Sequence, residues 1–320
     1  MIFVNVKNAP GIEKAHQIWV ERMRGEEHSS RVRDHCFLIK FIFCSEVLCL
    51  PVHFFWLCAL RKILRLRTVG VFHGFANKEH YSPLRYYLLK IAQWITWRTT
   101  NIHVYNSKLT LNCLMHDFQS ERQNNDFIIY PTQKAYRSIE VSSFECRHVV
   151  YFGRMVAAKN VHLIMREFKK SRVACSHKLI LFGGFVDKTV QTELEELETN
   201  GRILYFGDYH NHLSLREKLK KLGCSNGFFI SWNESEPFGL VYQEAIELGL
   251  LPLLPFRAGF AEIIPERIAK QICFDSLESA FSAIAENRFR AKLGELKRSP
   301  VDDINAFSIH LRNNQNGKWK

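Results

Sequence analysis

Two acidic residues in the stretch Ser231–Gly249, SWNESEPFGLVYQEAIELG, have a spacing that could serve chemistry. Glu236 directly precedes Pro237, and Glu244 follows eight positions after Glu236. Pro237 fixes its φ and has no N–H to donate, so it suits the start of a helix. Glu236 would then lie in the loop before the helix and Glu244 about one and a half turns inside it. Carboxylates so placed can accept hydrogen bonds from sugar and ribose hydroxyls.

The residues between these two acids predict an anion site. If the helix begins near Phe238, the N–H groups of Gly239 and Leu240 point outward, and together with the helix dipole they suit a diphosphate. Gly239 lacks Cβ, so a ligand could approach its backbone closely. Glu244 would then bind a ribose and Glu236 a sugar, so that one helix end holds both ends of a nucleotide sugar.

Cations follow an apolar run earlier in the chain. The segment Arg147–Phe152, RHVVYF, reads as a strand, and it is followed by Gly153, Arg154 and, five positions later, Lys159. A departing nucleoside diphosphate gains negative charge in the transition state, and positioned cations stabilise that charge. Arginine offers a forked contact and lysine a mobile point charge.

Other residues at predicted strand ends are weaker candidates. His73 follows the strand Thr68–Phe72, and Gly11 lies in the loop Lys7–Gly11 that follows the strand Ile2–Val6. Ser107 follows a further strand and suits a helix N-cap better than a ligand contact. In open parallel sheets, ligands bind beyond the carboxyl ends of the strands.

Each candidate also has a purely structural interpretation. Acidic residues are common around helix N-termini, so Glu236 and Glu244 could be solvated charges. The cations could belong to an ordinary surface. His73 could be a buried, hydrogen-bonded histidine, and Gly11 a turn glycine.

Strands and helices alternate along the whole chain, which predicts βαβ units and parallel sheets. We expect an α/β fold of two Rossmann-like, doubly wound parallel-sheet domains that face each other across a cleft. The predicted boundaries give residues 1–145 as a short N-terminal domain with a linker and 146–290 as a C-terminal domain. Residues 291–320 are predicted to form a helix or tail that could cross back to the N-terminal domain. The second half is predicted to contain the strands Arg147–Phe152, Lys178–Phe182, Arg202–Phe206, Gly227–Ile230 and Leu250–Pro255.

Composition narrows the function classes. The 320 residues are 47% hydrophobic, as in a globular protein with a core, and the formal charge is +12. The nine cysteines are scattered and odd in number, which favours a reducing cytosol over a disulfide framework. The apolar region Phe37–Leu60 is interrupted by polar residues, so we expect a buried strand and helix there rather than a membrane span. The basic residues are spread out, and no nucleic-acid signature is present, so nucleic acid is not expected as a partner.

An ordered set of segments resembles the retaining nucleotide-sugar glycosyltransferases of the GT-B fold, in particular glycosyltransferase family 4, also called glycosyl transferases group 1. These segments are VVYFGRMVAAKN, KLILFGG, ILYFG, the SWNESEPFGLVYQEAIELG stretch with its two glutamates, and the weaker FRAGFAEII. VGVFHG and VYNSKLT in the first half are thinner matches.

The resemblance implies roles for the matching residues. Arg154, Lys159, Glu236 and His73 would form the catalytic group, with His73 near the transferred sugar. Gly153, Phe238, Gly239, Leu240, Glu244 and Gly11 would bind the donor.

The implied activity is transfer of a sugar from a nucleotide sugar to a hydroxyl of a glycan or lipid-linked acceptor. It would proceed with retention and serve cell-surface polysaccharide or lipopolysaccharide synthesis. The family usually lacks a dedicated metal site, so no metal or other cofactor is expected. The alternatives are a non-catalytic binding or partner protein of the same fold and, less favoured, a nucleic-acid-binding protein.

Aromatic and basic residues near the middle of the first half suit a membrane interface. The predicted helix Leu84–Arg98 carries Tyr87, Lys90, Trp94 and Trp97, and it also contains Arg85. Upstream of it come two further groups, Phe54, Phe55 and Trp56, then Arg61, Lys62, Arg65 and Arg67. We therefore expect a cytoplasmic protein that could rest on the anionic inner face of a membrane. The alternative is that the aromatic residues are core and the cations a solvated face.

Overall fold

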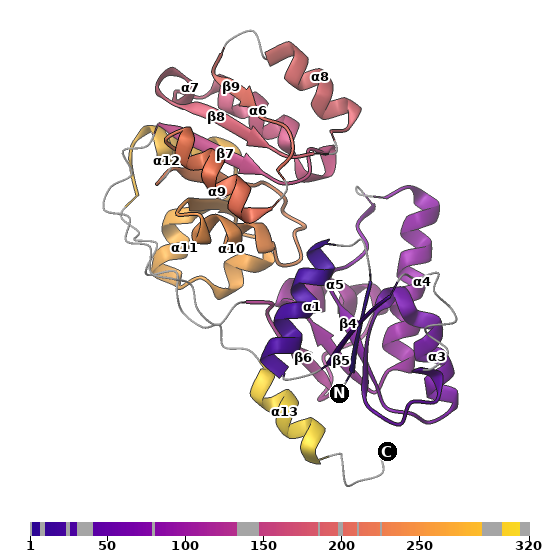
Figure 1. Ribbon diagram of the computed structural model, residues 1–320. Helices are drawn as coiled ribbons and strands as arrows, with labels where there is room; N and C mark the ends of the chain where they lie inside the picture. Colours follow the sequence, from indigo (N-terminus) through magenta and orange to yellow (C-terminus); the bar gives the residue numbers. More distant parts are fainter. Residues whose placement is uncertain are drawn as a thin grey trace. The chain divides into compact units, whose positions relative to one another are not determined.

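The chain divides into two compact units (Figure 1). The first contains Met1–Gln133 and Pro300–Lys320, and the second Lys134–Ser299. The computed structural model describes residues 2–6, 10–23, 26–30, 41–78, 81–132, 147–184, 186–197, 201–209, 211–224, 226–289 and 303–313. The boundaries predicted from the sequence, 145/146 and 290/291, lie outside the described residues and stay predictions.

The N-terminal unit is built on a six-stranded sheet in the order β2-β1-β3-β4-β5-β6, and every strand pair is parallel. Strands β3 to β6 are buried along their whole length, because a parallel sheet is covered on both faces. The strands are β1 Ile2–Val6, β2 Glu26–Ser30, β3 Leu48–Pro51, β4 Thr68–Phe72, β5 Ile102–Tyr105 and β6 Asp126–Ile128. The helices are α1 Pro10–Met23, η1 Val52–Phe54, α3 Phe55–Ile63, α4 Pro83–Thr99, α5 Lys108–Phe118 and α13 Ile304–Asn313.

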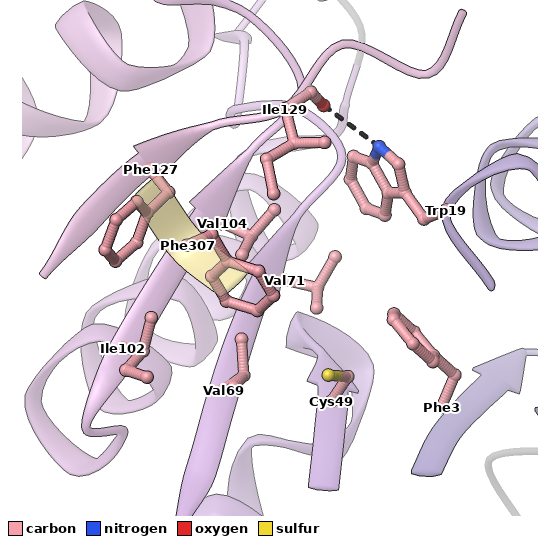
Figure 2. Packing of buried hydrophobic residues seen from close by; sticks show 10 residues of the cluster. All are labelled: Phe3, Trp19, Cys49, Val69, Val71, Ile102, Val104, Phe127, Ile129 and Phe307. Carbon is pink, nitrogen blue, oxygen red and sulfur yellow. Dashed lines mark hydrogen bonds between the residues drawn. The ribbon is translucent and has the colours of Figure 1, made fainter. Parts of the chain in front are cut away.

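One face of this sheet holds a core that joins the first and last described helices of the chain (Figure 2). Trp19 of α1 and Phe307 of α13 lie in the same cluster as Val71 of β4 and Val104 of β5. The indole of Trp19 donates a 2.9 Å hydrogen bond to the carbonyl of Ile129. Each large apolar side chain buried in this way contributes roughly 1.5–3 kcal/mol.

Helix α13 is fixed to strand β6 by hydrogen bonds as well as by packing. The Asp303 carboxylate accepts from the N–H of Ile128 at 2.8 Å and from the guanidinium of Arg122 at 2.7 Å. The N–H of Asp303 in turn donates to the carbonyl of Ile128 at 2.9 Å. The residues just before α13 therefore pair with the edge of the N-terminal sheet.

The C-terminal unit holds a second six-stranded sheet, in the order β12-β11-β10-β7-β8-β9, again with all pairs parallel. Its strands are β7 His148–Phe152, β8 Lys178–Phe182, β9 Ile203–Tyr205, β10 Phe228–Ile230, β11 Leu251–Pro255 and β12 Cys273–Phe274. Its helices are η3 Ala157–Lys159, α6 Val161–Lys170, α7 Val173–Ser176, α8 Lys188–Leu197, α9 His212–Lys221, α10 Leu240–Glu247, η5 Gly259–Ile263, α11 Glu266–Ile272 and α12 Leu277–Ala285.

The predicted class of two Rossmann-like parallel-sheet domains is confirmed by these two sheets. The five strands predicted in the second half are all present, each within two residues of its predicted ends. Strand β2, EEHSS, was missed because it is polar and lies at the edge of the sheet, where β1 is its one partner among the described strands. The predicted loop Lys7–Gly11 is wrong at its end, because α1 already begins at Pro10.

The apolar region Phe37–Leu60 is part of the N-terminal unit, as expected, although residues 37–40 lie outside the described residues. It supplies the buried strand β3 and most of α3. Among the helices of the described ranges, none is both long and apolar enough to cross a bilayer.

We predict that replacing Phe307 by alanine destabilises the N-terminal unit. Phe307 is 1% exposed and lies in the core cluster, so its loss should lower the free energy of unfolding by about 3–5 kcal/mol. Ile309 on the same helix is 56% exposed, and Ile309→Ala is the matched control with an expected change within about 0.5 kcal/mol. Chemical denaturation would measure both. Equal effects of the two variants would show that α13 does not contribute to this core.

Candidate active site

The ends of strands β7 and β8 come together through glycines. Gly153 follows β7, and its N–H donates to the carbonyl of Phe182 at 3.1 Å. A Cβ on Gly183, which follows β8, would lie 1.8 Å from the carbonyl oxygen of Gly153. Since that distance is far inside van der Waals contact, only glycine fits at position 183. The two loops are thus packed backbone against backbone at the carboxyl edge of the sheet.

Arg154 is held in place through its backbone. The hydroxyl of the buried Tyr151 donates to the carbonyl of Arg154 at 2.8 Å, while the Arg154 residue itself is exposed. Burial raises the pKa of Tyr151 well above its usual value, the nearby Glu236 carboxylate raises it further, and the Arg154 guanidinium opposes the shift. Tyr151 therefore lies close to both charged groups and stays a neutral donor.

Lys159 ends the short helix η3 and forms an ion pair with Glu236. Its Nζ donates to Oε2 of Glu236, and the two side chains are only 22% and 14% exposed. The start of η3 is fixed by Asp187, whose carboxylate accepts from the N–H of Ala157 at 2.6 Å. The lysine that follows β7 thus meets the acid that follows β10, a contact that was not predicted from the sequence.

The loop around Glu236 is closed by its own hydrogen bonds. The buried Asn233 side chain donates to Glu236 Oε2 at 3.3 Å and accepts from the N–H of Ser235 at 3.1 Å. The N–H of Gly259 donates to the carbonyl of Glu236 at 3.0 Å. Asn233 was not predicted from the sequence, although an Asn in a turn before Pro237 is a residue that bonds its own loop.

Helix α10 begins at Leu240 with Gly239 as its N-cap, two residues later than predicted. Gly239 has φ +87°, and a Cβ there would lie 2.6 Å from the ring of Tyr242. The structure therefore requires glycine at this position for conformation and for space. The side chain of Phe238 is buried against Phe260, so a donor could meet only its backbone. The N–H of Tyr242 donates to the carbonyl of Gly239 at 3.0 Å. The N–H groups before it, at the start of α10, have no partner within the helix and can bind an anion.

Glu244 lies beside the loop that follows strand β9. Burial raises the pKa of Tyr209, and the carboxylates of Glu244 and Asp208 raise it further, which places Tyr209 near both acids. The ring of His212 contacts the carbonyl oxygen of Glu244 at 3.4 Å. Tyr209 and His212 were missed because their closeness to Glu244 arises only when β9 and α10 are folded together.

The remaining predicted residues lie in the N-terminal unit. His73 follows β4, and its ring stacks on Trp19 with centroids 5.0 Å apart. The Asn106 side chain donates to the carbonyl of His73 at 2.7 Å. Gly11 is the second residue of α1, so its interpretation as a turn residue is wrong. Ser107 is a helix N-cap, as predicted, and accepts from the N–H of Thr110 at 3.0 Å. The relation of His73 and Gly11 to the donor-side residues stays a prediction.

The C-terminal unit can thus present two cations, a helix N-terminus and two carboxylates at one edge of its sheet. Within the described ranges, no group of three or more His, Cys, Asp or Glu side chains is arranged to hold a metal ion.

Comparisons with known proteins show what the chain is similar to. Residues 134–286 match the family model described as "Glycosyl transferases group 1". This segment is a little under half of the chain and contains every candidate residue of the C-terminal unit. The resemblance to GT-B glycosyltransferases of group 1 is thereby confirmed.

Solved structures of GT-B glycosyltransferases share the fold of the whole chain. HepE from Anabaena, in complex with UDP, is 13% identical with a TM-score of 0.63, and 98% of each chain is covered. The lipopolysaccharide outer core galactosyltransferase WaaB is 10% identical with a TM-score of 0.62, covering 98% of this chain and 97% of its own. The pneumococcal O-GlcNAc transferase GtfA, in complex with UDP and GlcNAc, is 14% identical with a TM-score of 0.56, covering 89% and 58%. Among curated proteins, no sequence matches this chain significantly.

We predict that Gly239→Ala destabilises the C-terminal unit more than Gly223→Ala does. Both glycines have positive φ, but a Cβ on Gly223 meets nothing within 4 Å, whereas one on Gly239 clashes with Tyr242. Gly223→Ala should cost about 1–2 kcal/mol from conformation alone, and Gly239→Ala should cost more. Urea denaturation followed by circular dichroism would compare them, and equal losses would contradict the close packing under Gly239.

Proposed function

We propose that the protein transfers a sugar from a nucleotide diphosphate sugar to a hydroxyl of a glycan or lipid-linked acceptor, with retention at the anomeric carbon. One observation carries the proposal. Lys159 and Glu236, 77 positions apart, form a mostly buried ion pair just before the N-terminus of α10. A positive charge, a carboxylate and a helix N-terminus thus lie close together. The diphosphate of a nucleotide sugar can bind the charge and the helix N-terminus, and its sugar hydroxyls can bind the carboxylate.

Different residues bind different parts of the donor. The N–H groups at the start of α10, with Gly239 and Leu240, bind the diphosphate, and Lys159 and Arg154 neutralise the charge that grows as it departs. The ammonium of Lys159 has three N–H donors, so it can keep Glu236 in place while it donates to a phosphate oxygen. Glu236 accepts from hydroxyls of the transferred sugar.

Glu244 would accept from the ribose on the side of the loop that contains Tyr209. The departing diphosphate assists deprotonation of the acceptor hydroxyl. We assign His73 to the sugar side of the site, and we include Gly11, Gly153 and Phe238 as backbone contacts to the donor.

The structural neighbours support a UDP-hexose donor. HepE was solved with UDP and GtfA with UDP and GlcNAc, and WaaB is named as a galactosyltransferase of the lipopolysaccharide outer core. By analogy we place the reaction in cell-surface polysaccharide or lipopolysaccharide synthesis, on the cytoplasmic side of a membrane. We also propose that transfer needs no metal and no other cofactor, with Lys159, Arg154 and the helix dipole supplying the charge.

We predict that Lys159→Ala mainly lowers kcat, by about 100-fold, because it removes one cation from the departing diphosphate. Steady-state kinetics with a UDP-sugar and a glycan acceptor would measure this. Lys270→Ala is the matched control, since it breaks a lysine–glutamate pair on the surface of the same unit, and it should change nothing.

Loss of the ion pair itself must be separated from loss of the phosphate contact. Lys159→Ala leaves the Glu236 carboxylate unpaired, so a cycle with Glu236→Gln and the double variant isolates the pair. If Lys159 acts on the diphosphate, the double variant is at least as slow as Lys159→Ala, because it also loses the contact of Glu236 with the sugar. Recovery of kcat in the double variant would reduce Lys159 to a structural partner of Glu236.

We further predict that UDP-sugars raise the melting temperature of the protein and that Glu244→Ala removes about half of this shift or more. At 100 times Kd a ligand adds about 2.7 kcal/mol of stability, which is a shift of several degrees. Losing hydrogen bonds to a carboxylate should weaken donor binding by roughly tenfold or more. Glu217→Ala, an exposed acid on α9, is the control. The shift and the transfer should both survive EDTA. A screen of nucleotide diphosphate sugars in which none binds would contradict the proposed function.

A further inference from the structure

Helix α4 of the N-terminal unit exposes a continuous apolar stripe. Its members are spaced three or four residues apart and so share one face of the helix. They are Leu84, Tyr87, Leu88, Ile91 and Trp94, which are 72%, 59%, 57%, 54% and 47% exposed. The opposite face is buried against the unit and includes Tyr86, Gln93 and Trp97. An apolar stripe of this width on a globular protein normally faces a core or a partner.

The neighbouring helix also exposes apolar side chains. Helix α3 packs against α4 (Figure 1), and the segment at its carboxyl end exposes Leu60, Ile63 and Leu64, which are 39%, 76% and 41% exposed. We call the exposed side chains of the two helices and this segment the α3/α4 face.

The charge of the α3/α4 face has one sign. Lys62, Arg65, Arg85 and Arg98 are all exposed, and neither helix sequence contains an Asp or a Glu. Arg98 follows Trp94 by four residues, and its guanidinium lies 5.8 Å from the centroid of that ring. Arg98 and the apolar stripe therefore belong to the same helix surface.

The face differs from the residues that the sequence suggested for a membrane. Phe54 and Trp97 are buried, so they belong to the core. Arg61 is fully buried as well, and its guanidinium donates to the carbonyls of Phe41, Cys44, Glu46 and Arg67. Lys90 pairs with Asp117 at 2.8 Å.

We infer that the α3/α4 face docks on the surface of an anionic lipid bilayer. Tyrosine and tryptophan side chains favour the headgroup level, the leucines and isoleucines bury in the outer acyl region, and the arginines and lysines bind lipid phosphates. The absence of any acid in the two helices makes the face complementary to a negative surface. The inference goes beyond sugar transfer and is tested by binding alone, so it can fail while the proposed function stands.

Vesicle flotation of the full chain tests the inference. The probes are vesicles of phosphatidylcholine with 30% phosphatidylglycerol, and vesicles of phosphatidylcholine alone. The protein should bind the first kind and leave the second largely unbound at about 0.15 M salt. The double variant Ile91→Gln with Arg98→Glu should bind at least about tenfold more weakly, since it removes one apolar anchor and reverses one charge.

A matched control lies in the other unit. Leu213→Gln with Lys220→Glu changes one exposed leucine and one exposed lysine of α9, with the same change in net charge. It should bind the anionic vesicles like the original protein. Equal weakening of both double variants would show attraction by net charge alone and would overturn the inference.

The fluorescence of Trp94 gives a second readout. The protein has six tryptophans, and adding anionic vesicles should shift the emission to the blue through Trp94. Trp94→Phe should lose most of this shift while still floating with the vesicles. A full shift in Trp94→Phe would mean that another surface inserts. Gel filtration could instead show a dimer that becomes a monomer in the Ile91→Gln, Arg98→Glu variant, which would mean that a second copy covers the face. Either this result or a full shift in Trp94→Phe rejects the inference.

Discussion

The ion pair between Lys159 and Glu236 is the interaction on which the site depends. It joins the loop after β7 to the loop after β10 across two adjacent strands of the C-terminal sheet. A partly buried pair of this kind is stable only if its remaining hydrogen-bonding capacity is also used. Asn233 donates to the same carboxylate oxygen. The pair thereby places a cation near the N-terminus of α10, where an anion would otherwise meet only N–H groups.

Close backbone packing keeps this arrangement stiff. Two tyrosines of the sheet each donate a hydrogen bond to a backbone carbonyl in the loops at its edge. The hydroxyl of Tyr151 donates to the carbonyl of Arg154, and that of Tyr205 donates to the carbonyl of Gly183 at 2.6 Å. Glycine at position 183 lets that loop touch the one that contains Gly153, with no side chain between them. The groups that would stabilise a departing phosphate are therefore in position before a donor arrives, which is the condition for electrostatic catalysis.

Much of the fold could be predicted from the sequence because the buried parallel strands are apolar runs, some of them ended by glycine, as in KLILFGG. The two glutamates and the Gly-Arg after β7 were found because each follows such a run. The polar edge strand β2 gave no comparable signal. The start of α10 was misjudged because proline at 237 suits a first turn, whereas the left-handed Gly239 ends the loop two residues later. Tyr209, Asn233 and the lysine–glutamate pair depend on contacts between distant segments, which local patterns do not contain.

The return of α13 to the N-terminal unit sets an order of assembly during synthesis. The N-terminal sheet completes its core with Phe307 and its edge with Asp303, and both follow the entire second unit along the chain. A ribosome therefore releases all six strands of the second sheet before the first sheet can close over its last helix. The unit translated first therefore cannot complete its core until the whole second unit has left the ribosome.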